Sequence, residues 1–150
     1  MKQTLTALPD DLFAQLQKEN LVLLATVDAE TGFPATNAMS WVYAKDPVTI
    51  RFAVDARSRI VGNLTANPKA SLTFFGSGSV YSCTGSVRVV TESLEDVPFQ
   101  MTCYDLQIDG VRDVMFYGSR IIAEPECEKT YNQRAAERLD RQVYEAMKKA

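Results

Sequence analysis

The segment from residue 21 to residue 54 contains three runs of β-forming residues that are separated only by turns. The runs lie near 21–28, 35–43 and 48–54, and the sequences between them, DAETGFP and AKDP, contain the Gly, Pro and Asp residues that are typical of turns. This pattern predicts a meander of neighbouring strands, and it restricts the chain to folds that are built on an antiparallel sheet.

One short helix interrupts the strands, and a hairpin follows it. The sequence ARSRIVGNLTANP has Ile60, Val61 and Leu64 at helical spacing and Pro68 beyond the end, which predicts a helix that crosses one end of the sheet. The next two runs, KASLTFFG and SVYSCTGSVRVVTE, are joined by GSGS and predict a hairpin. This Gly-Ser turn lacks the lysine and the following helix of a phosphate-binding loop, so we interpret it as a plain turn.

The ends of the chain complete the predicted fold. The sequence LPDDLFAQLQKEN predicts an opening helix, and the tail 129–150 predicts a closing one. Between them, we expect residues 94–110 to form a helix or a loop excursion and residues 111–126 to form the last strand. The prediction is therefore a mainly β (α+β) fold, a six-stranded antiparallel barrel with flanking helices, in a single domain over residues 1–150.

The composition limits the possible partners. A net charge of -3 and a pI near 5.0 provide no broad basic face for nucleic acid or an anionic membrane, so any anion site is expected to be local. No segment has the length and apolar character of a membrane span. Three widely spaced cysteines suit a reducing compartment, fit neither a disulfide framework nor a metal site, and favour a cytoplasmic protein.

The turn before the short helix concentrates positive charge. Arg57 and Arg59 lie on either side of Ser58 where a strand is predicted to end, and guanidinium groups hold phosphate well because they donate paired hydrogen bonds. Arg57 could join such a clamp or point to solvent, and two solvated turn arginines are the alternative. Asp55 is expected to cap the turn or the helix.

The order of motifs around this turn resembles that of the pyridoxamine 5'-phosphate oxidase-like, FMN-binding split-barrel family, and in particular its short members of the general stress protein 26 type. The shared elements are an apolar strand, a Ser-Arg turn, a helix with Asn-Leu, then Asn-Pro and another apolar strand. Here they are Phe52, Ser58-Arg59, Asn63-Leu64, Asn67-Pro68 and ASLTFF. GFPATNAMSWVY and the glycine-containing VYSCTGSVRVVTESLED are similar to two further strands of the family.

The resemblance implies a split barrel that binds FMN in two grooves at the interface of a homodimer. Ser58 and Arg59 would hold the phosphate, and the flavin ring would lie along the second strand. The candidate cofactor-binding residues are Ala38, Met39, Ser40, Trp41, Val54, Arg57, Ser58 and Arg59. Because side chains alternate along a strand, only one of Asn37 and Ser40 could face the ring. The single tryptophan, Trp41, either packs in a core or interface or stacks near the flavin.

The chain departs from the vitamin B6 oxidases of the family. It has Ile60 where they have lysine, and Ala38 where they have arginine. It contains no histidine, so it lacks the C-terminal histidine that grips their phosphorylated substrate. We therefore do not expect oxidation of vitamin B6 phosphates.

The absence of histidine also removes the ordinary general base, so we do not expect hydrolytic chemistry. A flavin carries its own redox chemistry, which predicts an FMN-dependent oxidoreductase that moves hydride between a reduced nicotinamide or small substrate and an acceptor. The alternatives are a non-catalytic flavin carrier or stress-related sensor, and a barrel that holds heme or a deazaflavin. No dinucleotide fingerprint is present, so nicotinamide binding is expected to be weak. The apolar runs FAV, SLTFF and DVMFYGSRII exceed what one thin barrel covers and also favour a homodimer.

Overall fold

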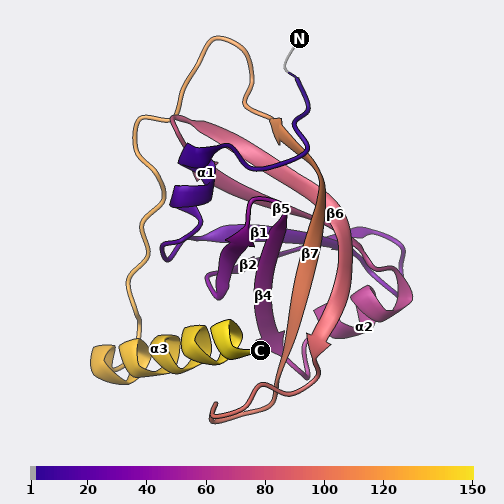
Figure 1. Ribbon diagram of the computed structural model, residues 1–150, viewed down its shortest axis with the longest axis vertical. Helices are drawn as coiled ribbons and strands as arrows, with labels where there is room; N and C mark the ends of the chain where they lie inside the picture. The colour runs from indigo at the N-terminus through magenta and orange to yellow at the C-terminus, as the bar shows by residue number, and fades with distance from the viewer. Residues whose placement is uncertain (1–2) are drawn as a thin grey trace.

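The computed structural model describes residues 3–150, which form seven strands and three helices (Figure 1). The helices are α1 (Asp10–Gln15), α2 (Arg59–Ala66) and α3 (Gln133–Lys149). The strands are β1 (Val22–Val27), β2 (Pro34–Met39), β3 (Val42–Asp46), β4 (Thr49–Asp55), β5 (Lys69–Gly76), β6 (Ser79–Thr91) and β7 (Met101–Asp113).

All seven strands belong to one antiparallel sheet with the order β2-β1-β5-β6-β7-β4-β3. The sheet is not closed, and its two edge strands, β2 and β3, are consecutive in the chain. Ser40 and Trp41 connect them, and the Val42 N–H donates to the Ser40 carbonyl at 2.9 Å, which bends the chain at this point. The split-barrel architecture is confirmed, but the predicted count of six strands is wrong because the run 35–43 is divided into two strands at this corner.

Two other expectations for the second half of the chain are wrong. Residues 101–113 form the long strand β7, where we expected a helix or loop over 94–110 and a strand over 111–126. β7 pairs with β4 on one side and β6 on the other, and this double pairing outweighs its polar sequence. Residues 114–132, which we call the strap, form no strand. Figure 1 shows the strap leaving β7 and descending along one side of the molecule to α3.

The remaining elements follow the prediction. The opening helix α1 has Pro9 as its N-cap and Asp10 and Asp11 in its first turn. The hairpin of β5 and β6 turns at Ser77 and Gly78, which both have positive φ values (49° and 74°), so the Gly-Ser sequence is a plain turn. The opening, crossing and closing helices are therefore present, and the predicted hairpin is confirmed.

The buried side chains form two clusters. The main core packs Leu12 and Leu16 of the α1 region against sheet residues such as Leu24, Phe52 and Phe74. The second cluster lies under α3 and combines residues of β3, β4 and β7 with that helix. Its buried members are Tyr43, Ala53, Leu94, Met101, Cys103, Val143, Ala146 and Met147. The closing helix therefore has a hydrophobic seat of its own.

The close approach of β6 and β7 explains why position 85, in the sequence SCTGSV, is a glycine. Gly85 lies at a bulge where the register between β6 and β7 shifts. A Cβ atom at this position would lie 2.0 Å from the carbonyl oxygen of Gln107, so the strands can approach this closely only at a glycine.

Among residues 3–150, none of the helices combines the length and the apolar character that crossing a bilayer requires.

Candidate functional site

The turn between β4 and α2 is organised by Asp55 and Ser58. The Asp55 carboxylate accepts hydrogen bonds from the Arg57 backbone N–H at 2.8 Å and from its guanidinium at 3.1 and 3.0 Å, which confirms that Asp55 caps the turn. Ser58 is the N-cap of α2, and its hydroxyl oxygen accepts from the Ile60 N–H at 3.1 Å. Arg57 is thus folded back onto its own turn.

Arg59 extends from the first turn of α2 towards the hairpin between β1 and β2. Its Nη2 atom lies 2.6 Å from an Asp28 oxygen and 3.8 Å from a Glu30 oxygen, while 69% of its side chain stays exposed. Backbone N–H groups of Thr31 and Glu30, and then Arg59, lower the pKa of Asp28 to about 2. The charge of Arg59 is therefore balanced by carboxylates that are distant in sequence, whereas the charge of Arg57 is balanced by Asp55 within the turn.

Asn63 fixes α2 to the same hairpin. Its buried amide donates to the Thr26 hydroxyl at 3.0 Å and accepts from the Ala29 N–H at 2.9 Å. This contact explains the asparagine of the Asn-Leu motif, because it holds the start of the hairpin turn beside the helix that carries Arg59.

Strand β2 connects the two parts of the candidate site. In its ladder with β1, Pro34 lies opposite Val27, next to the Asp28 that Arg59 contacts, and Met39 lies opposite Val22. The five steps from Pro34 to Met39, at about 3.3 Å each, separate these ends by roughly 17 Å. Ala38 is exposed and Met39 half-buried, and the strand is an edge of the sheet, so some of its backbone groups have no neighbouring strand to pair with.

The corner at Ser40 and Trp41 brings the end of β2 close to the end of β4. The Trp41 carbonyl accepts from the Ala53 N–H at 3.1 Å, which places the corner next to Ala53 and one residue from the buried Val54. The corner therefore lies beside Ala53 of β4, four residues before Arg57, while the side chain of Val54 is buried in the main core.

The Trp41 indole is directed towards the second cluster. Its ring lies 6.3 Å from that of Phe99, and its Nε1–H donates to Asp140 of α3 at 2.8 Å. These contacts match the packing alternative for Trp41.

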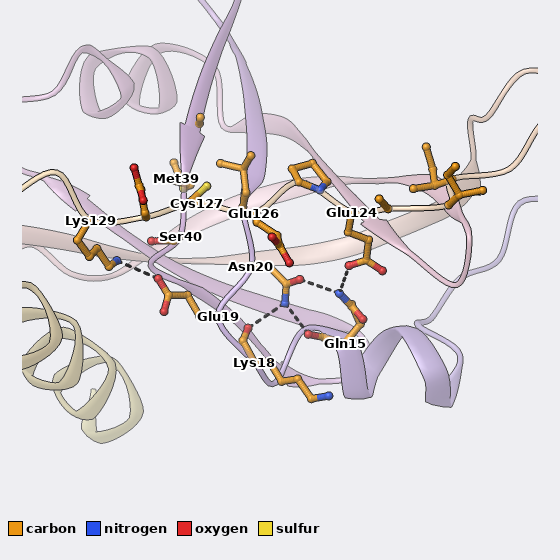
Figure 2. A pocket seen from close by; sticks show the side chains of 17 residues that line it. Gln15, Lys18, Glu19, Asn20, Met39, Ser40, Glu124, Glu126, Cys127 and Lys129 are labelled. Carbon is orange, nitrogen blue, oxygen red and sulfur yellow. Dashed lines mark hydrogen bonds and ion pairs between the residues drawn. The ribbon is translucent and has the colours of Figure 1, made fainter. Parts of the chain in front are cut away.

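A cleft of about 1100 Å³ opens at the Met39 end of β2 (Figure 2). Its walls come from the end of β2, the connection between α1 and β1, and the strap. The lining residues are Gln15, Lys18, Glu19, Asn20, Leu21, Ala38, Met39, Ser40 and 121–129.

The walls of this cleft are fastened to each other by polar contacts. Lys129 of the strap pairs with Glu19 at 3.0 Å, and Gln15 donates to Glu124 at 2.9 Å, as Figure 2 shows. Glu126 and Glu128 also line the cleft, so acidic groups outnumber the two lysines among its lining residues. The cleft therefore disfavours strongly anionic ligands.

Sequence reasoning missed several of these residues. Asp28 and Glu30 were not connected with the arginines, and the strap was interpreted as a strand and not as the wall of a cleft. A turn rich in acids, DAETG, was the only local signal for Asp28 and Glu30.

The architecture defines the class of protein: an open antiparallel split barrel with a short helix across one end. The family model for pyridoxamine 5'-phosphate oxidase matches residues 8–115, and the chain belongs to this family, which is of the flavin-binding oxidoreductase type. Its members generally bind flavin nucleotides. No match was found among curated proteins.

Solved structures share the fold at low sequence identity. A candidate pyridoxamine 5'-phosphate oxidase from Lactobacillus delbrueckii is 22% identical, with a TM-score of 0.62 over 73% of this chain and 97% of the other. A second candidate oxidase, from Listeria innocua, is 14% identical, with a TM-score of 0.55 over 70% and 96% of the two chains. General stress protein 26 from Bacillus anthracis is 11% identical, with a TM-score of 0.56 over 73% and 96%.

The residues present fit a flavin mononucleotide. An exposed guanidinium and a helix N-terminus lie at one end of β2, where a phosphate needs donors. Exposed Ala38 and the free edge of β2 leave room and backbone groups for a flat ring at the other end. Asp28, Glu30 and Asp55 lie around the same turn, so bound phosphate must compete with them for the arginines.

Proposed function

We propose that this protein is an FMN-dependent oxidoreductase that transfers hydride between a reduced nicotinamide or small substrate and an acceptor. The observation that carries the proposal is the placement of the exposed Arg59 guanidinium at one end of β2 and an open cleft at its other end. This arrangement suits a ligand with a phosphate at one end and a reactive ring at the other.

The chain's own residues would bind and orient the cofactor. Arg59 would exchange its contact with Asp28 for the phosphate, and the Ser58 hydroxyl, which uses its oxygen to cap α2, keeps its proton to donate. Residues Ala38 to Trp41 and Val54 would lie along the ring. When bound, the flavin supplies the hydride chemistry, while the protein excludes water and positions the substrate.

The cleft provides the route for the electron donor. Since Ala38, Met39 and Ser40 form one wall, a molecule in the cleft would lie beside the proposed ring position. A nicotinamide dinucleotide carries an anionic diphosphate, which the acidic lining repels. We therefore expect weak nicotinamide binding and faster reduction by a less anionic donor.

The alternative function is a flavin-binding carrier or sensor without turnover. One form of it requires the segment 94–110 to cover the ring. Most of this segment is β7, which is held in the sheet between β4 and β6 and is not available as a cover. An open cleft at the proposed ring position favours the oxidoreductase. The visible spectrum of the purified protein distinguishes FMN from heme and deazaflavin, and a heme or deazaflavin spectrum would replace FMN in this proposal.

Membership of the family does not imply oxidation of vitamin B6. Ile60 provides no charge to the phosphate site, and the chain has no histidine to grip a phosphorylated substrate. The proposed substrate is therefore different from pyridoxamine 5'-phosphate.

We further propose a homodimer in which each FMN lies at the interface. Large apolar side chains are exposed on the strap and on the hairpin between β1 and β2, where a partner subunit would cover them. They include Phe33, Val114, Phe116, Tyr117 and Ile122. Light scattering at micromolar concentration tests this, and a monomer would also remove the two-subunit site.

The three cysteines are free thiols, two of them buried, and burial raises the pKa of Cys83 to about 12. Because unpaired thiols suit a reducing compartment, we also propose that the protein is cytoplasmic.

The proposed function is tested by the visible spectrum of the purified protein, followed by anaerobic mixing with NADH or NADPH. We expect a flavin spectrum, slow bleaching with a high apparent KM, and return of the colour in air. If neither nicotinamide bleaches the bound flavin while a chemical reductant does, the carrier is the better description.

A further inference from the structure

The corner at Ser40 and Trp41 needs support from outside the sheet. It interrupts the edge of the barrel, and the backbone hydrogen bonds that hold it run from Val42 N–H to Ser40, within the corner, and from Ala53 N–H of β4 to Trp41. An edge position with few ladder contacts is able to shift unless other elements fix it.

Helix α3 contacts both residues of this corner. Asp140 accepts a hydrogen bond from the Trp41 indole at 2.8 Å, and the Tyr144 hydroxyl donates to the Ser40 carbonyl. Asp140 and Tyr144 are four residues apart, so they lie on one face of the helix. Burial, followed by the charge of Glu19, raises the pKa of Tyr144 to about 12, so its hydroxyl remains a donor throughout the neutral pH range.

The same face of α3 is linked to the cleft. Lys129 of the strap lies 2.7 Å from Asp140 and 3.0 Å from Glu19, between the helix and the cleft wall. These two carboxylates, Asp140 first, raise the pKa of the Lys129 ammonium. Asp140 therefore connects the corner, through Trp41, with the strap that encloses the cleft.

Helix α3 is itself held firmly. Val143 and Met147 are buried in the second cluster, and the Arg51 Nη1 atom donates to the carbonyls of Met147 and Ala150, both at 2.9 Å. A buried guanidinium at a helix C-terminus satisfies carbonyls that would otherwise lack donors. The helix can therefore serve as a fixed support.

The segment that the family model matches ends at residue 115, whereas α3 begins at Gln133. Family membership therefore assigns no role to α3. We propose that α3 positions the Ser40–Trp41 corner against the flavin ring through Asp140 and Tyr144, and that it sets the wall of the cleft through Lys129. Asp140 and Tyr144 are positioning residues in this proposal, which rests on the proposed function.

The contact between α3 and the corner can be measured without cofactor, because the chain has a single tryptophan and its indole emission therefore reports on Trp41. Asp140→Ala removes the indole's partner and should shift the emission to longer wavelength and increase quenching by acrylamide. Asp140→Asn keeps an acceptor for the indole but loses the charge that pairs with Lys129, so its emission should stay close to that of the wild type. Glu145→Gln, an exposed change on the same helix, is the matched control and should leave the emission unchanged.

The effect of this contact on the cofactor is measured by FMN titration and by the visible spectrum of the bound flavin. We expect Asp140→Ala and Tyr144→Phe each to weaken FMN binding about fivefold and to alter the flavin absorption bands, as loss of one positioning hydrogen bond predicts. Tyr144→Phe is a small change, and a wild-type circular dichroism spectrum would show that it folds. Lys129→Met should leave FMN affinity near wild type and change the KM of the electron donor.

Different results would contradict the proposed function and the positioning role of α3. If wild-type protein binds no FMN, the proposed function is wrong and this inference falls with it. If the wild type binds FMN, and folded Asp140→Ala and Tyr144→Phe bind it with unchanged affinity and spectrum, the positioning role is overturned while the proposed function stands.

Discussion

Two arginine sites of this protein show how surroundings decide the role of the same side chain. Arg51 is 3% exposed, forms two hydrogen bonds with Asp105 and caps the end of α3, whereas Arg59 is 69% exposed and contacts Asp28 and Glu30 at the surface. A buried guanidinium without its partners would be very costly, so Arg51 is committed to the fold. The exposed guanidinium of Arg59 can exchange its partner, and it is therefore available to a ligand.

The largest effect is expected at the buried site. Arg88 also contacts Asp105, at 2.9 Å. Arg51→Met leaves the buried Asp105 with this largely exposed partner. It also removes the donor to the carbonyls of Met147 and Ala150. We expect a loss of about 3 kcal/mol in the free energy of unfolding, in the range for breaking a buried pair. Urea denaturation measures this loss. A change below about 1 kcal/mol would show that the two sites differ less than their burial indicates.

Substitution of the exposed Arg59 should weaken ligand binding and leave the stability of the fold almost unchanged. Arg59→Ala should leave the urea midpoint close to wild type, because a surface ion pair contributes little to stability. FMN binding should weaken by about 2 kcal/mol or more, since a charge-assisted hydrogen bond to the phosphate is lost. Arg57→Ala is the matched control in the same turn. It should cost less, because Arg57 is folded onto Asp55; an equal or larger loss would reverse the assignment of the two arginines.

The acidic partners of Arg59 predict a smaller effect of opposite sign. Glu30 lies 3.8 Å from Arg59 and is exposed, so it opposes a phosphate without holding the turn. Glu30→Gln should strengthen FMN binding by about threefold or less, as expected for a screened surface charge. Isothermal titration at low and high salt checks this, and the gain should shrink as salt is added.

The smallest expected effect concerns the titration of Asp28. Its pKa in the folded protein is about 2, against an ordinary value of 3.8. The ionised carboxylate therefore favours the folded state above pH 3.8, and this contribution is lost as the pH falls through 2. Backbone N–H groups of Thr31 and Glu30 are the leading causes, with Arg59 a later one. In a carboxyl NMR titration, Arg59→Ala should consequently raise the pKa of Asp28 only slightly, and a return to 3.8 would show that Arg59 dominates.

The contrast between the two arginine sites also explains what the sequence could predict. The Ser-Arg turn, the short helix and the β5–β6 hairpin depend on neighbouring residues, and local patterns predicted them. Arg51 lies in the strand that also contains the apolar run FAV. Nothing near it in the sequence indicates that Asp105, 54 residues later, is its partner. The strand that contains Asp105 was missed for the same reason, because its polar residues are stabilised by pairing with β4 and β6.

The apolar run after β7 caused the opposite error, because it was predicted to be a strand and forms none. Val114, Phe116 and Tyr117 have the composition of a strand, yet they are exposed on the strap. The contacts of α3 with the corner were equally invisible, because helical spacing predicts a helix but does not predict which surface it covers. Most candidate residues of the site were therefore identified from the family resemblance, whereas Asp28, Glu30 and the cleft were found only from the structure.

The proposed cofactor site depends on the Ser58–Arg59 turn, which would bind the phosphate of FMN. It is tested most directly by titrating wild-type apoprotein and Arg59→Ala with FMN and with riboflavin, which has no phosphate, and following the quenching of flavin fluorescence. We expect wild-type protein to bind FMN at least about tenfold more tightly than riboflavin, and we expect this difference in affinity to narrow in Arg59→Ala. Equal affinity of the wild type for the two flavins would contradict it.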